Sequence, residues 1–286
     1  MRWLARRLGS RSAQSERPGV ETHGPPSDAG IEHAHPDLPP AFRDVYTACA
    51  PYTMTSIERM YALYEAVRHV ARIGIAGDVV ECGVWRGGSS MLAAETLLAL
   101  EEERDIWLYD TFAGMPEPSV RDVDHTGLRA VEVWEDVKRD TSSNVLALAS
   151  RDEVESNLAR TGFPARSLNF VQGRVEETIP AYAPERIAIL RLDTDWFEST
   201  YHELVHLYPR LATGGVLIID DYGHWHGARE AVDRYFDEVG NGPLLARIDY
   251  TGRMGVKPPK PSDSLNGPPA TADEDPRQRR RSPPDG

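Results

Sequence analysis

Residues 79–90 of the chain read VVECGVWRGGSS. The stretch begins as a short, largely apolar run that suits a buried strand, and its last residues begin a helical pattern over Ser89–Glu103. Gly83 permits a tight turn between the two, and Gly87 and Gly88 allow a ligand to approach the backbone near a helix N-terminus. A strand, a glycine-rich turn and a helix in this order are typical of the ligand-binding edge of a parallel α/β sheet, although such turns also occur without a ligand.

The same alternation of apolar runs and helical patterns continues along the chain. None of the runs alternates polar with apolar residues, as expected for strands that helices cover on both faces. The runs that predict strands are Val79–Cys82, Ile106–Tyr109, Leu168–Val171, Ile187–Leu192 and Val216–Ile219, with Leu244–Ile248 and Arg253–Val256 as an edge hairpin. The predicted helices are a stretch from the capping-box pair Thr55 and Glu58 to Ala71, then Ser89–Glu103, Arg151–Arg160, Ser199–Leu211 and Ala228–Val239. We therefore expect an α/β fold with a doubly wound, seven-stranded, mostly parallel sheet and a C-terminal antiparallel hairpin.

Two proline-rich tails flank this region. Residues 1–40 and 258–286 hold most of the prolines and little that could form a core, so we expect both to be disordered around one domain at 41–257. The segment 113–150 interrupts the alternation with many charges and weak periodicity, as active-site lids and substrate-recognition loops do.

Composition narrows the class of protein. The 286 residues carry a formal net charge of −13, which argues against a non-specific nucleic-acid binder. The two cysteines, Cys49 and Cys82, cannot form a disulfide framework, so a reducing cytoplasm is the simpler expectation. The basic N-terminus lacks the apolar stretch of a secretory signal, and no apolar run is long enough to cross a membrane. We expect no nucleic-acid or membrane partner.

An acidic residue follows the second predicted strand. A carboxylate at Asp110 can accept hydrogen bonds from both hydroxyls of a ribose, and Phe112 can cover an adenine ring. Nucleoside cofactors of different kinds use an acid at this place, so Asp110 supports a nucleoside site without identifying the cofactor.

Further acids follow the fourth and fifth predicted strands. Asp193 ends one run, and Asp220 and Asp221 end the other, where the sheet brings strand ends together. Clustered acids repel one another and are costly to hold ionised when buried, unless a hard cation such as Mg²⁺ neutralises them. The pattern predicts a magnesium site, with helix capping by Asp195 or Asp221 as the alternative.

Other motifs are open or absent. His224 and His226 follow the last acids, where an imidazole can accept a proton near neutral pH, although loop histidines are commonly only solvated. The glycine spacing is not G-x-G-x-x-G, and Trp85 and Arg86 are bulky beside a pyrophosphate, which disfavours a dinucleotide. The sequence has neither a nucleophile elbow nor a P-loop, so hydrolase and kinase functions are disfavoured.

Four motifs in order resemble the macrocin O-methyltransferase family. They read VECGVWRGG at 80–88, YDTFAGMP at 109–116, RLDTD at 191–195 and IDDYG at 219–223, and GRVEET at 173–178 adds to the match. The similarity runs from about Tyr52 to Lys257. It implies a class I S-adenosylmethionine fold and Mg²⁺-dependent methyl transfer to a sugar hydroxyl, on deoxysugars of macrolide-like glycosylated natural products.

The resemblance also implies roles for individual residues. Those expected near S-adenosylmethionine are Met54, Thr55, Glu81, Gly83, Gly87, Gly88, Ser89, Asp110, Thr111, Phe112, Val175 and Glu176. The implied metal ligands are Asp193, Asp220 and Asp221, and the proton acceptor is Asp193 or, as the less favoured choice, His224. The acceptor would be a small-molecule glycoside, and relatives of this kind often form symmetric homo-oligomers.

Three rival functions remain. A catechol-type methyltransferase would share the fold, cofactor and metal, but such enzymes commonly have a lysine where this chain has Trp196. A non-catalytic nucleoside-binding protein of the same fold would not need acids at all three metal positions. An NAD-linked reductase is disfavoured by the glycine spacing.

Overall fold

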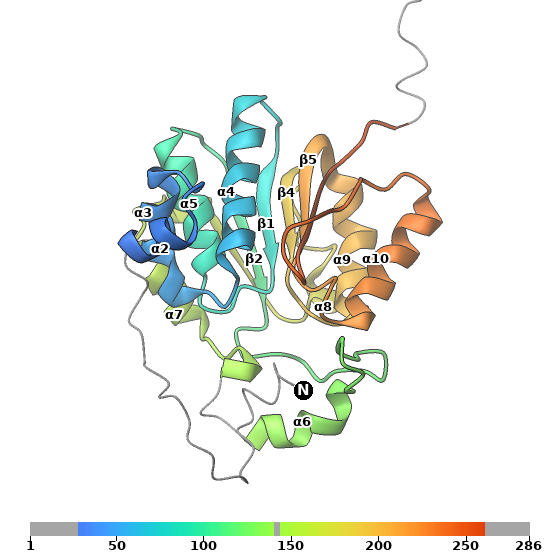
Figure 1. Ribbon diagram of the computed structural model, residues 1–286. Helices are drawn as coiled ribbons and strands as arrows, with labels where there is room; N and C mark the ends of the chain where they lie inside the picture. Colours follow the sequence, from blue (N-terminus) through green and yellow to red (C-terminus); the bar gives the residue numbers. More distant parts are fainter. Residues whose placement is uncertain (1–27, 140–143, 261–286) are drawn as a thin grey trace, which may run out of the picture.

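The chain is represented by a computed structural model that describes residues 28–139 and 144–260 (Figure 1). Its centre is a seven-stranded sheet in the order β3-β2-β1-β4-β5-β7-β6. The first five strands pair in parallel, and β7 runs antiparallel to both of its neighbours. The strands are β1 (Asp78–Cys82), β2 (Ile106–Asp110), β3 (Leu168–Gln172), β4 (Ile187–Leu192), β5 (Leu211–Ile219), β6 (Ala246–Arg247) and β7 (Arg253–Val256). The expected sheet is therefore confirmed, including its antiparallel C-terminal pairing.

The winding of the sheet reverses between β1 and β4. The chain moves from β1 outward to β2 and β3, then returns to β4 on the other side of β1 and continues to β5. Strands β1 and β4 pair in a register that sets Glu81 opposite Arg191. In open α/β sheets, ligands bind outside the carboxyl ends of the strands at such a reversal.

Helices cover both faces of the sheet (Figure 1). One face carries α4 and α5, with α3 against α5, and the other carries α9 and α10, which pack on each other. Helix α6 lies beyond the carboxyl edge of the sheet. The helices are α2 (Asp28–Ala34), α3 (Pro40–Cys49), α4 (Ile57–Arg72), α5 (Gly88–Ala99), α6 (Ala130–Arg139), α7 (Arg151–Ala159), α8 (Val175–Thr178), α9 (Phe197–Leu207) and α10 (His226–Val239), and short 3-10 turns lie at Ala50–Tyr52, Asn144–Leu146, Ala165–Ser167 and Tyr208–Arg210.

The hydrophobic core is divided by the sheet into two layers. Strand residues such as Val79 and Ile218 belong to the layer that contains α4 and α5. Their chain neighbours Val80 and Ile219 belong to the layer that contains α9 and α10. Successive strand residues point to opposite faces, so both sets are buried and the strands show no polar alternation.

Several predicted boundaries were wrong. Helix α5 ends at Ala99 and not at Glu103, because Glu101 adopts a left-handed backbone conformation with φ of 55°, and β5 begins at Leu211 and not at Val216. The side chain that caps α4 is Ser56, whose Oγ accepts a hydrogen bond from the backbone N–H of Arg59 at 3.2 Å, and not Thr55. The hydroxyl of Thr55 instead accepts from Arg191 at 2.9 Å. Helix α9 ends at Leu207, four residues before the predicted end, because a 3-10 turn containing Pro209 leads directly into β5.

The folded region begins before the predicted boundary at residue 41. Residues 28–34 form α2, and the side chains of Ile31 and Leu38 are buried in the same core layer as Phe42. The prediction of a disordered extension was therefore wrong for residues 28–40, because two apolar side chains in a polar segment suffice to dock it. Residues 258–260 form no helix or strand, and residues 1–27 and 261–286, which make up the rest of the predicted tails, lie outside the described residues. No helix in the described ranges combines the length and apolar character needed to cross a membrane.

Candidate active site

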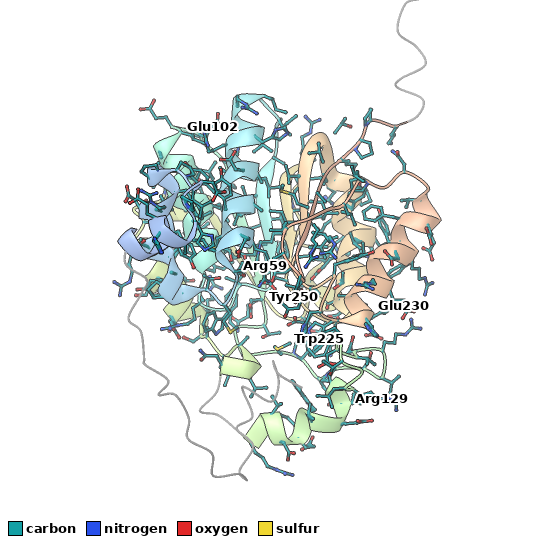
Figure 2. All side chains as sticks on the ribbon, viewed as in Figure 1. Arg59, Glu102, Arg129, Trp225, Glu230 and Tyr250 are labelled. Carbon is teal, nitrogen blue, oxygen red and sulfur yellow. The ribbon has the colours of Figure 1, made fainter. Side chains whose placement is uncertain are left out.

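A pocket opens at the carboxyl ends of the central strands. Its lining comes from the ends of β1, β2, β4 and β5, from residues 52–55 before α4, and from α6. Figure 2 places Arg59, Trp225 and Tyr250 near this edge of the sheet and Glu102 at the opposite end. The pocket is thus at the place where the sheet topology predicts a ligand.

The carboxylate of Asp110 holds the glycine-rich turn after β1. Its Oδ2 accepts hydrogen bonds from the backbone N–H groups of Val84 at 2.7 Å and Trp85 at 3.1 Å, and its Oδ1 accepts from Phe112 N–H at 2.7 Å. Burial raises the pKa of Asp110, and these backbone hydrogen bonds oppose that shift. Asp110 therefore shapes the turn as well as lining the pocket.

Strained backbone is concentrated around the pocket. Trp85 and Asp195 both line the pocket and have φ angles of 47° and 66°. Phe112, which follows the lining residue Thr111 in the chain, has a φ angle of 51°. Residues other than glycine rarely adopt this left-handed conformation, and it persists where surrounding contacts impose it, as at ligand sites. At Gly83, with φ of 83°, a Cβ atom would lie 2.0 Å from the backbone oxygen of Asp193. Only glycine lets β1 and β4 approach each other this closely.

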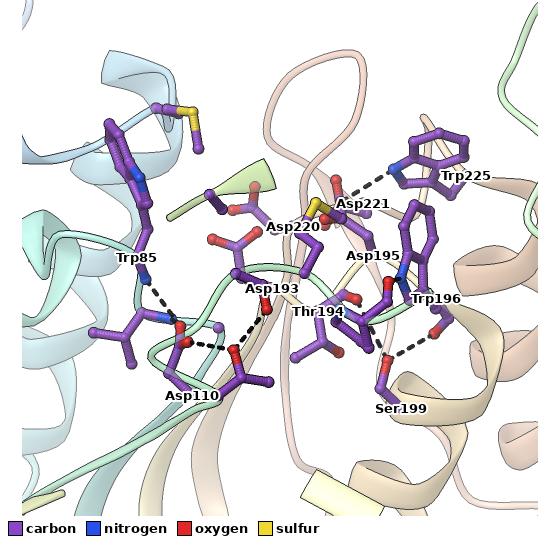
Figure 3. Close-up of a pocket in the computed structure, with 18 of the residues that line it drawn as sticks. Trp85, Asp110, Asp193, Thr194, Asp195, Trp196, Ser199, Asp220, Asp221 and Trp225 are labelled. Carbon is purple, nitrogen blue, oxygen red and sulfur yellow. Dashed lines mark hydrogen bonds between the residues drawn. The ribbon is translucent and has the colours of Figure 1, made fainter. Parts of the chain in front are cut away.

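Three aspartates meet in the pocket. Ligand oxygens of Asp193, Asp220 and Asp221 all lie within 4.8 Å of one another. In Figure 3 they stand between Trp85 and Asp110 on one side and Trp196 and Trp225 on the other. The predicted meeting of acids from β4 and β5 is borne out by this geometry.

The buried guanidinium of Arg191 lies beneath the aspartates. Its Nη1 is 2.5 Å from Glu81 and 2.8 Å from Asp193, and its Nη2 is 2.6 Å from Asp220. Burial lowers the pKa of Arg191, but the charges of Asp193 and Glu81 outweigh burial and leave it raised. Arg191 therefore remains a fixed cation under the cluster.

Arg59, on the first turn of α4, forms a second ion pair with the cluster. It contacts Asp220, and its Nε lies 3.0 Å from Asp249 in the turn between β6 and β7. Ser56 donates a hydrogen bond to the same Asp249 at 2.8 Å. These pairs join the start of α4 and the C-terminal hairpin to the end of β5.

The two arginines do not neutralise the whole cluster. The Oδ2 atom of Asp221 is buried and has no hydrogen-bond partner among the described residues. Burial, followed by the charges of Asp195 and Asp193, raises the pKa of Asp221 well above its ordinary value. A buried carboxylate oxygen without a hydrogen-bond partner, close to the carboxylates of Asp193 and Asp220, fits the oxygen ligands that a divalent cation such as Mg²⁺ prefers.

The far side of the pocket is aromatic. The rings of Trp196 and Trp225 pack edge to face with their centroids 4.9 Å apart. Trp225 donates its indole N–H to Asp195 at 3.0 Å. His224, buried next to Trp225, has its Nδ1 3.1 Å from the hydroxyl of Tyr250, and both residues line the pocket.

Most of the residues predicted from the sequence line this pocket. They are Met54, Thr55, Gly83, Ser89, Asp110, Thr111, Val175, Glu176, Asp193, Asp220, Asp221 and His224. Four others do not. Glu81 lies beneath the pocket, where Ser90 donates a hydrogen bond to it, and Gly88 leaves room for the backbone of Tyr52. Gly87 and Phe112 are buried beside the turn, and His226 is exposed at the start of α10.

Sequence reasoning missed several lining residues. Arg59, Trp225 and Tyr250 line the pocket, and none of the three residues was predicted to do so. Helix α6 was also missed, although Ala130, Trp134 and Val137 are buried at helical spacing. Apolar residues at this spacing are the local signal that predicts a helix over residues 130–137.

Known proteins resemble this chain over most of its length. A family model described as macrocin-O-methyltransferase matches residues 42–255. The chain is 33% identical over 228 residues to the 8-demethyl-8-(2,3-dimethoxy-alpha-L-rhamnosyl)-tetracenomycin-C 4'-O-methyltransferase of Streptomyces olivaceus, covering 79% of this chain and 84% of that protein. It is 36% identical over 205 residues to the mycinamicin III 3''-O-methyltransferase of Micromonospora griseorubida, covering 70% and 76%.

A solved structure supports the same relationship. The structure of the O-methyltransferase NovP aligns with a TM-score of 0.63 and 30% identity, over 73% of this chain and 83% of that one. The family model spans more than half of the chain, and the sequence relatives exceed 30% identity. The chain therefore belongs to the macrocin-O-methyltransferase family and is an S-adenosylmethionine-dependent O-methyltransferase.

Proposed function

We propose that this enzyme methylates a hydroxyl of a deoxysugar on a glycosylated natural product, with Mg²⁺ held by Asp193, Asp220 and Asp221. The observation that carries the proposal is the position of the three aspartates between the two halves of one pocket. The names of the relatives, which act on a rhamnosylated tetracenomycin and on mycinamicin III, support a sugar acceptor.

The half of the pocket near β1 and β2 suits the cofactor. Asp110 ends β2 and Thr111 follows it, and Gly83 and Ser89 flank the glycine-rich turn. Each oxygen of a carboxylate has two lone pairs, and two backbone hydrogen bonds already use both pairs of Oδ2. Oδ1 accepts from Phe112 and lies 3.4 Å from the hydroxyl of Thr111, so Asp110 can accept a hydrogen bond from one ribose hydroxyl at Oδ1 if the Thr111 hydroxyl turns away. Val175 and Glu176, at the start of α8, complete this half near the expected adenine.

The protein's own residues supply orientation and proton transfer. A bound Mg²⁺ would act as a Lewis acid that lowers the pKa of the acceptor hydroxyl and orients a vicinal diol. Arg191 holds Asp193 and Asp220 in place. We assign the proton to Asp193, whose side chain is 26% exposed toward the pocket, with His224 as the alternative acceptor. Holding the two reactants in line removes roughly 7–11 kcal/mol from the barrier of a reaction between separate molecules.

Calorimetry tests this assignment in two steps. S-adenosylhomocysteine is first titrated into protein freed of metal with a chelator, and Mg²⁺ is then added with methyl α-L-rhamnoside, other vicinal-diol glycosides and catechols. We expect cofactor heat without metal and acceptor heat only with Mg²⁺ and a glycoside. If the folded protein binds no S-adenosylhomocysteine, the assignment of the cofactor site is wrong. If the acceptor binds equally well without Mg²⁺, the proposed role of the metal is wrong.

A further inference from the structure

Asp220, the proposed metal ligand that follows β5, is held by two arginines. Its Oδ1 lies 2.6 Å from Nη2 of Arg191, and its Oδ2 forms an ion pair with Nη1 of Arg59. The side chain of Asp220 is 4% exposed, so salt in the solvent screens both ion pairs only weakly. Each carboxylate oxygen of Asp220 therefore has a guanidinium group as its partner in this structure.

The two arginines differ in their position relative to the pocket. Arg191, in β4, is buried and does not line the pocket, and it also pairs with Glu81 and Asp193. Arg59, on the first turn of α4, lines the pocket together with all three aspartates. A metal ion that enters the pocket to bind the aspartates therefore meets the charge of Arg59 on its own side of the cluster.

Arg59 and a divalent cation compete for the same carboxylate oxygen. Asp221 offers a buried Oδ2 that has no hydrogen-bond partner among the described residues, whereas Oδ2 of Asp220 is engaged by the guanidinium of Arg59. Two cations at one carboxylate repel each other, and this repulsion is strong where little water is present to screen it. Binding of a metal ion by Asp220 therefore favours the release of Nη1 of Arg59.

A second carboxylate can hold Arg59 after it leaves Asp220. Nε of Arg59 donates a hydrogen bond to Oδ2 of Asp249 at 3.0 Å and lies 3.3 Å from Oγ of Ser56. Asp249 is itself fixed, because its Oδ1 accepts from two backbone N–H groups of the turn between β6 and β7, at 2.9 and 2.6 Å. The contacts with Asp249 and Ser56 use Nε, whereas the contact with Asp220 uses Nη1. Arg59 can therefore release one carboxylate and remain paired with the other.

Resting on the proposed function, we infer that Arg59 is a built-in counter-ion of the metal site, which pairs with both Asp220 and Asp249 without a metal ion and with Asp249 alone when the metal binds. Through this exchange Arg59 sets how tightly the aspartates bind the metal. Arg59 acts through Asp220 and is therefore a positioning residue. Its charge also makes closely spaced, buried carboxylates tolerable before the metal ion binds.

Titration with Mn²⁺, a spectroscopic substitute for Mg²⁺, tests the exchange by electron paramagnetic resonance. We expect Arg59→Met, which removes the charge and keeps an apolar side chain, to bind Mn²⁺ about tenfold tighter than the wild type, because no guanidinium competes for Asp220. A residue that only supported the structure would give weaker binding when replaced. Arg59→Lys keeps the charge and should stay within about threefold of the wild type. Arg68→Met makes the same change on the same helix, in an exposed ion pair with Glu65, and should leave the Mn²⁺ affinity unchanged.

A double-mutant cycle tests the part played by Asp249. Asp249→Asn keeps an oxygen for the backbone of the turn but removes the charge that holds Arg59 away from Asp220. In the wild-type background we expect this substitution to weaken Mn²⁺ binding by about threefold or more, because Asp220 then holds Arg59 more firmly. In the Arg59→Met background it should change the affinity by less than about twofold, since no guanidinium remains to be exchanged.

The outcomes separate this inference from the proposed function. If the wild type binds Mn²⁺ and Arg59→Met, folded by circular dichroism, binds it equally well or more weakly, Arg59 is no competitor and the exchange is wrong. Equal effects of Asp249→Asn in both backgrounds would also overturn the exchange, because Asp249 would then act by its own charge. If neither the wild type nor Arg59→Met binds Mn²⁺ at millimolar concentration, the proposed metal site is wrong and this inference fails with it.

Discussion

Nη1 of Arg191 lies 2.5 Å from Oε1 of Glu81, although 110 positions separate the two residues in the chain. They are opposed in the register of β4 and β1, and each side chain is 3% exposed. An ion pair buried this deeply is favourable only when further contacts satisfy both charges. Asp193 and Asp220 provide those contacts for Arg191, and Ser90 does so for Glu81. The pair therefore forms a rigid base for the proposed metal ligands.

Replacing this arginine is expected to weaken metal binding. Arg191→Lys keeps the charge but loses the planar fork that reaches three carboxylates at once. We expect the affinity for Mn²⁺, a spectroscopic substitute for Mg²⁺, to fall about 10–100-fold in electron paramagnetic resonance titrations, as for other residues that orient metal ligands. Arg234→Lys, in the exposed ion pair of Arg234 with Glu238 on α10, is the matched control and should leave the affinity for Mn²⁺ unchanged. Unchanged Mn²⁺ affinity in Arg191→Lys would contradict the orienting role.

Removing the proposed base and ligand should separate chemistry from cofactor binding. Asp193→Ala is expected to abolish turnover, because the carboxylate both binds the cation and accepts the proton in our proposal. Its dissociation constant for S-adenosylhomocysteine should stay within tenfold of that of the wild type. The surface variant Asp237→Ala, on the exposed side of α10, should retain full activity. Methylation by Asp193→Ala at the normal rate would contradict the metal mechanism.

Two glycines with similar backbone angles isolate the effect of close packing. Gly83 and Gly162 have φ angles of 83° and 74°, so alanine costs about 1–2 kcal/mol at either position from the left-handed backbone alone. A Cβ at Gly162 meets nothing within 4 Å, whereas at Gly83 it collides with the backbone of Asp193. Urea unfolding should therefore show a larger loss of stability for Gly83→Ala, accompanied by loss of cofactor affinity. Equal losses in both variants would mean that β1 and β4 can move apart freely.

A buried glutamate should make stability depend on pH. Glu203 is fully buried beneath the loop after β4, where Thr194 donates a hydrogen bond to it at 3.0 Å, and burial raises its pKa well above the ordinary 4.5. A raised pKa in the folded state means that folding favours the protonated form. Its stabilising contribution is therefore complete below about pH 4.5 and is lost as the pH rises through the folded-state pKa.

The variant Glu203→Gln removes this titration and keeps a carbonyl oxygen for Thr194. Between pH 5 and 8 we expect the free energy of unfolding to fall less with rising pH in the variant than in the wild type, as measured by urea denaturation at each pH. The surface variant Glu230→Gln provides the comparison. Parallel pH profiles for the wild type and Glu203→Gln would show that Glu203 titrates normally.

The sequence predicted the sheet and the acids at its edge, because both follow from local patterns and strand topology. The run Ile187–Leu192 matches β4 residue for residue, and its continuous apolar character reflects burial on both faces. The proximity of Asp193 and Asp220 could be predicted because the carboxyl ends of parallel strands lie at the same edge of the sheet. Homo-oligomeric assembly and a cytoplasmic location stay predictions.

Other features depend on contacts that no local pattern encodes. Arg59 reaches Asp249 across 190 positions, and neither residue stands in a recognisable motif. Thr55 and Ser56 are adjacent and equally suited to cap α4 by type, so only the tertiary contact of Thr55 with Arg191 distinguishes them. Local propensity cannot resolve such choices, because the partner comes from elsewhere in the fold.

The hydrogen bond between Asp122 and the start of α9 bears on how the acceptor specificity of this enzyme can diversify. Asp122, which is buried in the segment before α6, accepts a hydrogen bond from the backbone N–H of Phe197 at 3.0 Å. Every residue type except proline offers such an N–H at position 197. The contact therefore constrains little of the surrounding sequence, and the exposed residues of α6 can vary while Ala130, Trp134 and Val137 keep the helix packed. Exchanging residues 123–139 between relatives becomes a practical route to chimaeras that accept new natural products without disturbing the aspartates.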